Sequence, residues 1–120
     1  MAKVLIVEDD QTSIRLLRIL LEEVYGYALE FSRTGTDALT LAAANPPDLF
    51  LVDYRLNDID GITLIRKLRA MDQFKETPIV MASGMDVEDR ALAAGANRFL
   101  IKPYEPSALP TLFKELMNLP

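Results

Sequence analysis

Residues 4–10 read VLIVEDD, four consecutive apolar residues followed by three acidic ones. An apolar run this short and this unbroken is typical of a strand that is buried on both faces of a parallel sheet. Further short runs of β-branched and other apolar residues follow along the chain. The strands predicted in this way are residues 4–7, 28–31, 49–52, 79–82 and 99–101.

Between these runs lie segments whose apolar residues recur at helical spacing. The predicted helices are residues 12–25, 36–44, 61–71, 87–94 and 107–119. Alternating strands and helices predict an α/β fold, which we expect to be a single doubly wound, flavodoxin-like (βα)5 domain over residues 1–120. Right-handed crossovers with one reversal give its five-stranded parallel sheet the order 2-1-3-4-5.

The composition excludes several classes of function. The chain contains no cysteine and no histidine, which excludes thiol catalysis, disulfide scaffolds, zinc fingers and imidazole acid–base catalysis. Its net charge is −5 and it has no basic run, so we expect no binding to nucleic acid or to an anionic membrane. The first apolar run is too short for a signal peptide, and no run approaches the ~20 residues of a membrane helix. We therefore expect a soluble, cytoplasmic protein.

Polar residues follow the predicted strands, at what should be one edge of the sheet. Glu8 and Asp9 follow the first strand, and Asp53 follows the third. Ser83 follows the fourth strand and Lys102 the fifth. Ligands of doubly wound sheets bind beyond the carboxyl ends of the strands, where the first and third strands are neighbours. We expect three carboxylates to crowd into one pocket there, which favours either a retained proton or a bound cation.

The residue types at this edge indicate phosphoryl transfer. Carboxylate oxygens without histidine or cysteine suit a hard cation, and Mg²⁺ is the cofactor that we expect. Lys102 adds a compact ammonium group and Ser83 a hydroxyl donor. A cation, an ammonium, a hydroxyl and carboxylates around one point predict a site for phosphoryl transfer, with a carboxylate as the candidate nucleophile.

Several short segments become more informative when they are taken in order. They are VLIVEDD at residues 4–10, DLFLVD at 48–53, Asp60-Gly61, PIVMASG at 78–84, Gly95-Ala96 and KPY at 102–104. In this order and spacing the whole chain resembles the receiver domain of two-component response regulators, the CheY-like superfamily. The resemblance implies a phosphorelay switch rather than an enzyme. Its implied partners are a sensor histidine kinase or histidine phosphotransfer protein, and a downstream effector protein or a homodimer.

The resemblance also implies a metal and acceptor role for the acidic residues. Asp53 would be the phosphoacceptor. Mg²⁺ would be held by Asp9 directly, by Glu8 mainly through water, by Asp53, and by the backbone carbonyl of Arg55.

The resemblance further implies a conformational switch. Ser83 would be the switch hydroxyl, drawn inward by the phosphoryl oxygens, and Phe99 the switch aromatic, which would turn from exposed to buried. Lys102 would contact the acceptor site, and the Lys102–Pro103 peptide bond would be cis.

Some positions depart from the family pattern. Gly95 follows Ser83 by only 12 positions, so we expect a short fourth helix and a smaller output surface around the fourth helix, fifth strand and fifth helix. Arg55 and Met85, each two residues beyond a site residue, are bulky, and we expect them to hinder the attacking water and lengthen the phosphoryl lifetime. We expect Ile14, on an unusually apolar first helix, to be exposed and to help dock a histidine-containing donor; otherwise it packs on the loop after the fifth strand.

Other functions stay open at this point. Asp58-x-Asp60 is similar to the acidic pair of toprim-type nucleases, which would make the protein a Mg²⁺-dependent nuclease or phosphohydrolase. A flavodoxin-like FMN site is disfavoured, because Glu8, Asp9 and Asp10 would repel phosphate. A receiver-like interaction module that is never phosphorylated is favoured by the short fourth helix. The C-terminal residues are compatible with either a stand-alone regulator or an excised receiver.

Overall fold

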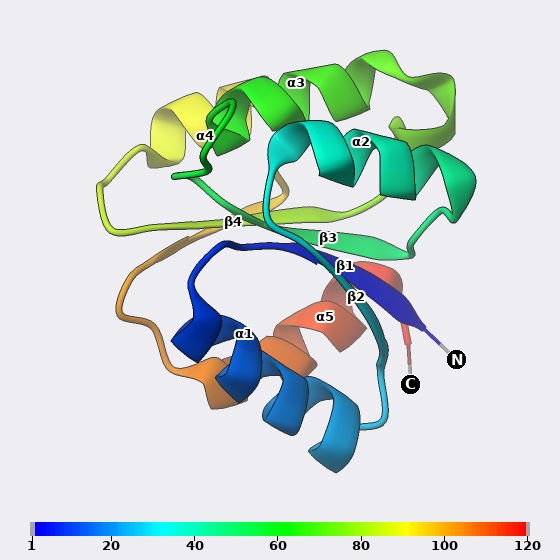
Figure 1. Cartoon of the computed structure of the whole chain (residues 1–120), viewed down its shortest axis with the longest axis vertical. Helices are drawn as coiled ribbons and strands as arrows, with labels where there is room; N and C mark the ends of the chain where they lie inside the picture. Colours follow the sequence, from blue (N-terminus) through cyan, green and yellow to red (C-terminus); the bar gives the residue numbers. More distant parts are fainter. Residues whose placement is uncertain (1, 120) are drawn as a thin grey trace.

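The central sheet has the predicted strand order. The computed structural model describes residues 2–119, which contain five parallel strands in the order β2-β1-β3-β4-β5. The strands are β1 (Lys3–Val7), β2 (Ala28–Ser32), β3 (Leu49–Asp53), β4 (Ile79–Ser83) and β5 (Arg98–Ile101). The winding of the chain therefore reverses between β1 and β3, which are neighbours in the sheet (Figure 1).

Helices cover both faces of this sheet. They are α1 (Gln11–Leu17), the π-helix η1 (Arg18–Val24), α2 (Gly35–Ala44), α3 (Gly61–Ala70), α4 (Glu88–Ala94) and α5 (Leu109–Met117), with short 3-10 turns η2 (Asp72–Phe74) and η3 (Pro106–Ala108). α2, α3 and α4 form the layer above the sheet in Figure 1, and α1 and α5 form the layer below it. The doubly wound, flavodoxin-like fold is confirmed. Within residues 2–119, no helix has the length and apolar character that crossing a bilayer would require.

The inner strands bury both of their faces, which explains the unbroken apolar runs of the sequence. In β1, Leu5 and Val7 pack into the cluster beneath α2 and α3. Val4 and Ile6 point to the opposite face and pack with residues of η1 and α5. All four side chains are at most 1% exposed. Two-sided burial removes the alternation of polar and apolar residues that a strand with one solvated face would show.

The strands end close together along the carboxyl edge of the sheet. Asp53, the last residue of β3, pairs with Ala82 in β4. Ser83, the last residue of β4, pairs with Ile101 at the end of β5. The Lys102 amide then donates to the Ser83 carbonyl oxygen at 2.7 Å. The polar residues expected after the third and fourth strands are thus the last residues of those strands, and their side chains are held by the sheet itself.

The first helix differs from the single α-helix predicted for residues 12–25. It is α-helical through α1 and then widens into η1, where the Tyr25 amide donates to the Leu20 carbonyl oxygen, five residues back, at 3.2 Å. A π-helical segment is uncommon and carries no marker such as proline in this sequence.

The prediction that Ile14 is exposed is wrong. Ile14 is 8% exposed and lies on the inner side of the helix, with Leu17 and Leu21. These residues follow the i, i+3, i+7 spacing of one helical face, and that face packs on the sheet. The apolar residue that the helix leaves exposed beside the carboxyl edge is Leu16, at 55%.

Candidate functional site

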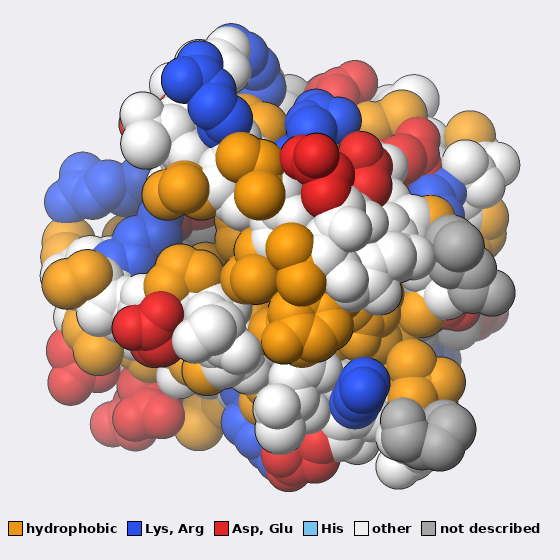
Figure 2. Space-filling model, turned by 90° about the horizontal axis from the view of Figure 1, so that it is seen from below, with side chains coloured by type: hydrophobic (Ala, Val, Ile, Leu, Met, Phe, Trp, Pro, Cys, Tyr) orange, Lys and Arg blue, Asp and Glu red, His pale blue; other side chains and the backbone are white. Residues whose placement is uncertain are grey.

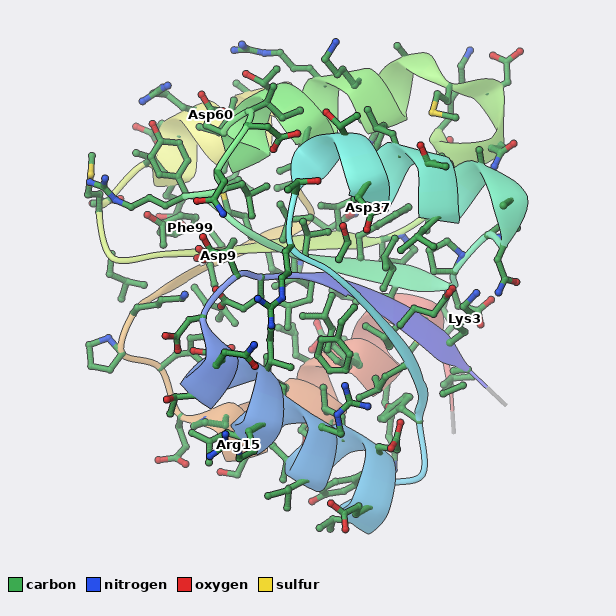
Figure 3. The ribbon with its side chains drawn as sticks, viewed as in Figure 1. Lys3, Asp9, Arg15, Asp37, Asp60 and Phe99 are labelled. Carbon is green, nitrogen blue, oxygen red and sulfur yellow. The ribbon has the colours of Figure 1, made fainter. Side chains whose placement is uncertain are left out.

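Three carboxylates meet at the carboxyl edge of the sheet. Glu8 and Asp9 follow β1, Asp53 ends β3, and one oxygen from each lies within 4.8 Å of the others. Figure 3 shows Asp9 where the chain leaves β1 for α1. Glu8 is 5% exposed and Asp53 9%, so two of the three carboxylates are largely removed from water. The expected crowding of these three side chains is therefore present.

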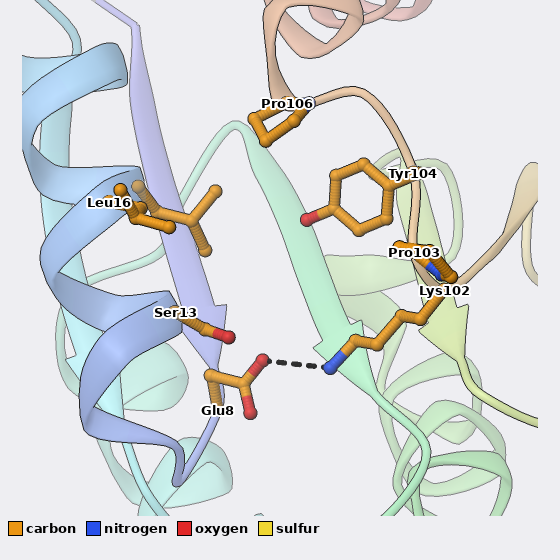
Figure 4. Close-up of a pocket in the computed structure, with 8 residues that line it drawn as sticks. Glu8, Ser13, Leu16, Lys102, Pro103, Tyr104 and Pro106 are labelled. Atoms are coloured by element: carbon orange, nitrogen blue, oxygen red, sulfur yellow. Dashed lines mark hydrogen bonds and ion pairs between the residues drawn. The ribbon is translucent and has the colours of Figure 1, made fainter.

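Lys102 connects two of the three carboxylates. Its Nζ lies 2.8 Å from Oδ1 of Asp53. The same Nζ lies 3.1 Å from Oε1 of Glu8 (Figure 4). The Lys102–Pro103 peptide bond is cis. Glu8 is held further by its own backbone, because its Oε2 accepts from the amides of Asp9 and Asp10 at 3.2 and 3.3 Å.

Burial and charge shift the pKa values of this cluster. Burial raises the pKa of Glu8, and the nearby Asp53 carboxylate adds to the effect. Burial also raises the pKa of Asp53, although Lys102 opposes the shift. Burial by itself would lower the pKa of Lys102, but the hydrogen bond and charge of Asp53, together with Glu8, outweigh it and leave this pKa raised. The cluster therefore binds positive charge readily.

The donor set of the cluster suits Mg²⁺. Its three carboxylates face one ammonium, so full ionisation leaves two net negative charges, equal in size to the charge of a divalent cation. All of the side-chain donors are oxygens, which a hard cation prefers. The cluster of Glu8, Asp9 and Asp53 thus matches a divalent cation in both charge and atom type.

Ser83, Arg55 and Met85 lie together at the same edge. The buried Ser83 hydroxyl oxygen accepts from the Met85 amide at 3.0 Å. The Arg55 guanidinium donates to the Met85 sulfur, with Nη2 and Sδ 3.0 Å apart. Both long side chains are exposed. The two positions singled out by the sequence as controls on water access are therefore in contact with each other.

Phe99 lies in β5 and is partly buried. Its ring packs against the core cluster beneath α3 and also borders a hollow of about 290 Å³ with Asp86, Glu88 and Ile101. The expectation of an exposed starting position is thus met only in part. The other residues that border this hollow are exposed, so it lies on the solvent side of the ring.

The other acidic residues near this edge cap helices. Asp10 caps α1 by accepting from the Ser13 amide at 2.9 Å. Asp60 caps α3 by accepting from the Thr63 amide at 2.8 Å. Their carboxylates are therefore engaged by backbone groups and not aimed at the cluster.

Asp58 has a structural role that the sequence reasoning missed. From the loop between β3 and α3, its carboxylate accepts from the amides of Gly35 and Thr36, each at 2.8 Å, and from the Thr36 hydroxyl at 2.6 Å. The Asp58 carboxylate thus binds the first turn of α2. Together with the cap formed by Asp60, this accounts for the Asp-x-Asp pattern without a nuclease metal site.

A mainly apolar groove of about 400 Å³ adjoins Glu8 and Lys102. Leu16 forms its wall on α1, and Pro103, Tyr104 and Pro106 form the opposite wall (Figure 4). The Tyr104 hydroxyl points across the groove toward α1. Sequence reasoning named Ile14 for this region, and the structure assigns the position to Leu16.

Comparison with known proteins identifies the family. The response regulator receiver domain family matches residues 4–114. The chain belongs to this family. Receiver domains are the signalling domains of two-component systems, and the strand order described above is that of a receiver domain.

Relatives of this receiver domain include both larger and similar-sized proteins. Response regulator PleD of Caulobacter vibrioides is 35% identical over 107 residues, which are 87% of this chain and 23% of PleD. The chain thus spans about a quarter of the length of that relative. Chemotaxis protein CheY1 of Helicobacter pylori is 33% identical over 112 residues, 89% of this chain and 90% of CheY1.

Solved structures show the same receiver architecture. A putative response regulator from Chloroflexus aurantiacus matches with a TM-score of 0.91 at 33% identity, covering 98% of both chains. Chemotaxis response regulator CheY4 of Vibrio cholerae matches with a TM-score of 0.89 at 28% identity, covering 97% of this chain and 98% of CheY4.

Proposed function

We propose that this receiver domain accepts a phosphoryl group on Asp53 in a Mg²⁺-dependent phosphorelay. The donor would be the phosphohistidine of a sensor histidine kinase or of a histidine phosphotransfer protein, in the cytoplasm. The observation that carries the proposal is the position of Lys102 Nζ, 2.8 Å from Asp53 and 3.1 Å from Glu8, beside the oxygen-only cluster.

The transfer itself needs little beyond positioning and charge neutralisation. A carboxylate oxygen of Asp53 attacks phosphorus, the new O–P bond forms, and the N–P bond to the donor imidazole breaks. The electron pair of that bond stays on the imidazole nitrogen, which can then take a proton from water. Lys102 favours the ionised, nucleophilic form of Asp53 through its charge and hydrogen bond.

Glu8, Asp9 and Asp53 would hold Mg²⁺, together with the backbone carbonyl of Arg55. The bound ion would supply neutralisation of the phosphoryl oxygens. Glu8 has a second role, because its Oε1 pairs with Lys102 and holds the ammonium beside Asp53.

Phosphorylation would be read out through Ser83 and Phe99. The Ser83 hydroxyl oxygen accepts from Met85, and its own proton would turn to the phosphoryl oxygens. Phe99 would then turn inward beside β4 and change the surface of α4, β5 and α5 that an effector protein contacts. Because α4 has only seven residues, we expect β5 and α5 to carry more of that contact.

The experiment is phosphorylation by acetyl phosphate, followed by intact-protein mass spectrometry. Wild type with Mg²⁺ should gain one phosphoryl group that is stable in acid and released by hydroxylamine. Asp53→Asn should gain none, and omission of Mg²⁺ should abolish the gain in wild type. Asp72→Asn is the matched control, because the Asp72 side chain is 95% exposed and lies outside the cluster.

Two outcomes would overturn the proposal. A normal adduct on Asp53→Asn would place the acceptor elsewhere. A wild-type protein that binds Mg²⁺ but never gains a phosphoryl group, from acetyl phosphate or from a phosphorylated histidine protein, would instead be an interaction module with the receiver fold.

A further inference from the structure

The outward side of the first helix carries apolar surface that nothing within residues 2–119 covers. Leu16 is 55% exposed, Ile19 47% and Val24 65%, and Leu20 is partly exposed. Figure 2, seen from below toward the α1 and α5 layer, shows hydrophobic side chains gathered at the centre with charged ones around them. Apolar residues concentrated on one exposed element indicate an interaction surface, whereas scattered single residues do not.

The change from α1 to η1 brings residues spaced by four into line. In an α-helix of 3.6 residues per turn, a residue four positions on passes one full turn. In a π-helix, whose hydrogen bonds span five residues, it falls short of one. Along residues 11–24, the over-rotation in α1 is therefore offset by the under-rotation in η1, and residues four apart stay nearly in line. One line therefore contains Leu16, Leu20 and Val24, and the neighbouring line contains Arg15, Ile19 and Glu23.

The second line has opposite charges at its two ends. Arg15 lies four residues before Ile19, and Glu23 lies four residues after it. Both charged side chains are exposed, and within residues 2–119 neither forms an ion pair. Figure 3 shows Arg15 on the helical layer below the sheet. The line thus has a positive residue, Arg15, an apolar residue, Ile19, and a negative residue, Glu23, in that order. In an antiparallel copy the order is reversed, so opposite charges face each other across the pair.

We propose that a second copy of this chain packs on this face, with the two α1–η1 helices antiparallel across a two-fold axis at Ile19. Ile19 then meets its own counterpart, and Arg15 pairs with Glu23 of the partner subunit in two equivalent places. Two-fold interfaces require a patch that is complementary to itself, and this line of residues has that property. Leu16 and Val24, in the neighbouring line of residues, extend the apolar contact on one side of Ile19.

The dimer should be weak. One helix pair buries less than the roughly 800 Å² per partner of a standard stable interface. Exposed ion pairs add little affinity but select the antiparallel register. We therefore expect a dissociation constant on the order of 100 µM, which makes the association sensitive to local concentration.

Sedimentation equilibrium tests the proposal directly. Between roughly 10 µM and roughly 1 mM, the weight-average mass of wild type should rise from 13.4 kDa toward twice that value. Arg15→Glu and Glu23→Arg should each weaken the dimer about tenfold or more, because each places like charges opposite one another. The double variant Arg15→Glu/Glu23→Arg restores opposite charges and should return the affinity to near the wild-type value.

Arg66→Glu on α3 is the matched control. Arg66 is also exposed, but it lies in the layer on the other side of the sheet, so this variant should dimerise like wild type. Circular dichroism of every variant checks that the fold is intact. We expect an intact fold, because the substituted residues are all exposed.

The proposal is overturned if wild type stays at monomer mass throughout, if Arg15→Glu dimerises like wild type, or if the double variant fails to restore the dimer. A monomeric wild type whose residues 15–24 bind a histidine phosphotransfer protein would show that the face serves a donor and not a second copy. These outcomes are independent of whether Asp53 accepts a phosphoryl group.

Discussion

Lys102 sets the balance of charge at the site. Its ammonium touches two carboxylates that would otherwise repel each other, and it reaches them from the strand two places away from β3. Sequence reasoning predicted this meeting because the carboxyl ends of parallel strands share one edge. It could not predict which side chain in the first helix faces the site, because that depends on how α1 seats against the sheet, and there Leu16 replaces Ile14.

Replacing Asp53 with Asn should stabilise the protein when Mg²⁺ is absent. Burial raises the pKa of Asp53, so the folded protein holds this proton more tightly than the unfolded chain does. The ionised carboxylate therefore costs stability at high pH, and the cost disappears as the pH falls toward the pKa of an unfolded aspartate. We expect Asp53→Asn to melt above wild type at pH 8, and the difference to shrink at pH 4.

Thermal melts with Asp72→Asn as a control check this prediction. Asp72 is exposed, so its variant should melt within about 1 °C of wild type at both pH values. A lower melting temperature for Asp53→Asn at pH 8 would show that its contact with Lys102 outweighs the cost of burial.

Arg55 and Met85 should control how long the phosphoryl group survives. Their side chains contact each other across 3.0 Å at the edge of the site, where an attacking water would enter. Replacing Arg55 by Asn together with Met85 by Glu should shorten the half-life of phosphorylated protein about tenfold, equivalent to about 1.4 kcal/mol in the barrier. Loss of the phosphoryl mass with time measures the half-life, and an unchanged value would contradict this role.

At the scale of the elements, hydrogen bonds fix the loop between β3 and α3, both across its own ends and to the start of α2. The Gly61 amide donates to the Tyr54 carbonyl oxygen at 2.8 Å, and Asp58 binds the start of α2. A side chain at Gly61 would clash with the Asp53 carbonyl oxygen, so only glycine allows this close approach. These contacts hold the segment that carries Arg55, and they explain why Asp58 is acidic without lying in the carboxylate cluster.

Replacing Asp58 with Ala should lower stability in a pH-dependent way. Hydrogen bonds from Thr36, and then from Gly35, hold the pKa of Asp58 well below its usual range. The folded state therefore favours the charged form, so the stabilisation is present above the pKa of an unfolded aspartate and is lost as the pH falls. Asp58→Ala should melt below wild type at pH 7, and the difference should narrow at pH 3. A constant difference would assign the effect to packing alone.

The elements themselves were largely predictable from the sequence. Each strand lies within one residue of its predicted bounds at both ends, because two-sided burial leaves an unbroken apolar run. The η1 segment was not predictable, since its apolar spacing also suits an α-helix and only packing selects the wider turn. The role of Asp58 was not predictable either, because its partners, Gly35 and Thr36, lie more than 20 residues away in the sequence.

At the scale of the whole molecule, the site lies at the carboxyl ends of the strands, between the two helical layers (Figure 1). The strand order alone brings Asp9, Asp53 and Lys102 together from three distant parts of the chain. A change of charge at this edge therefore occurs next to the helices on both faces of the sheet. This position is suited to a domain that responds to one chemical event on several surfaces.

Mg²⁺ should stabilise the whole fold through this edge. A ligand at ten times its dissociation constant stabilises the folded state by about 1.4 kcal/mol, or about 5 °C in melting temperature. The rise should be larger at pH 8 than at pH 5, because protons compete for the buried carboxylates, whose pKa values are raised. EDTA should reverse it. Asp9→Asn should lose most of the effect, and an equal rise in that variant would place the ion elsewhere.

The most direct test of the central claim is to identify the residue that carries the phosphoryl group. Borohydride reduces an aspartyl phosphate to homoserine, so protein treated with acetyl phosphate and Mg²⁺, then reduced and digested, can be mapped by tandem mass spectrometry. We predict homoserine at position 53 and unchanged aspartate at positions 9, 10, 58 and 60. Homoserine at any of those other positions, with aspartate retained at 53, would contradict the proposed site.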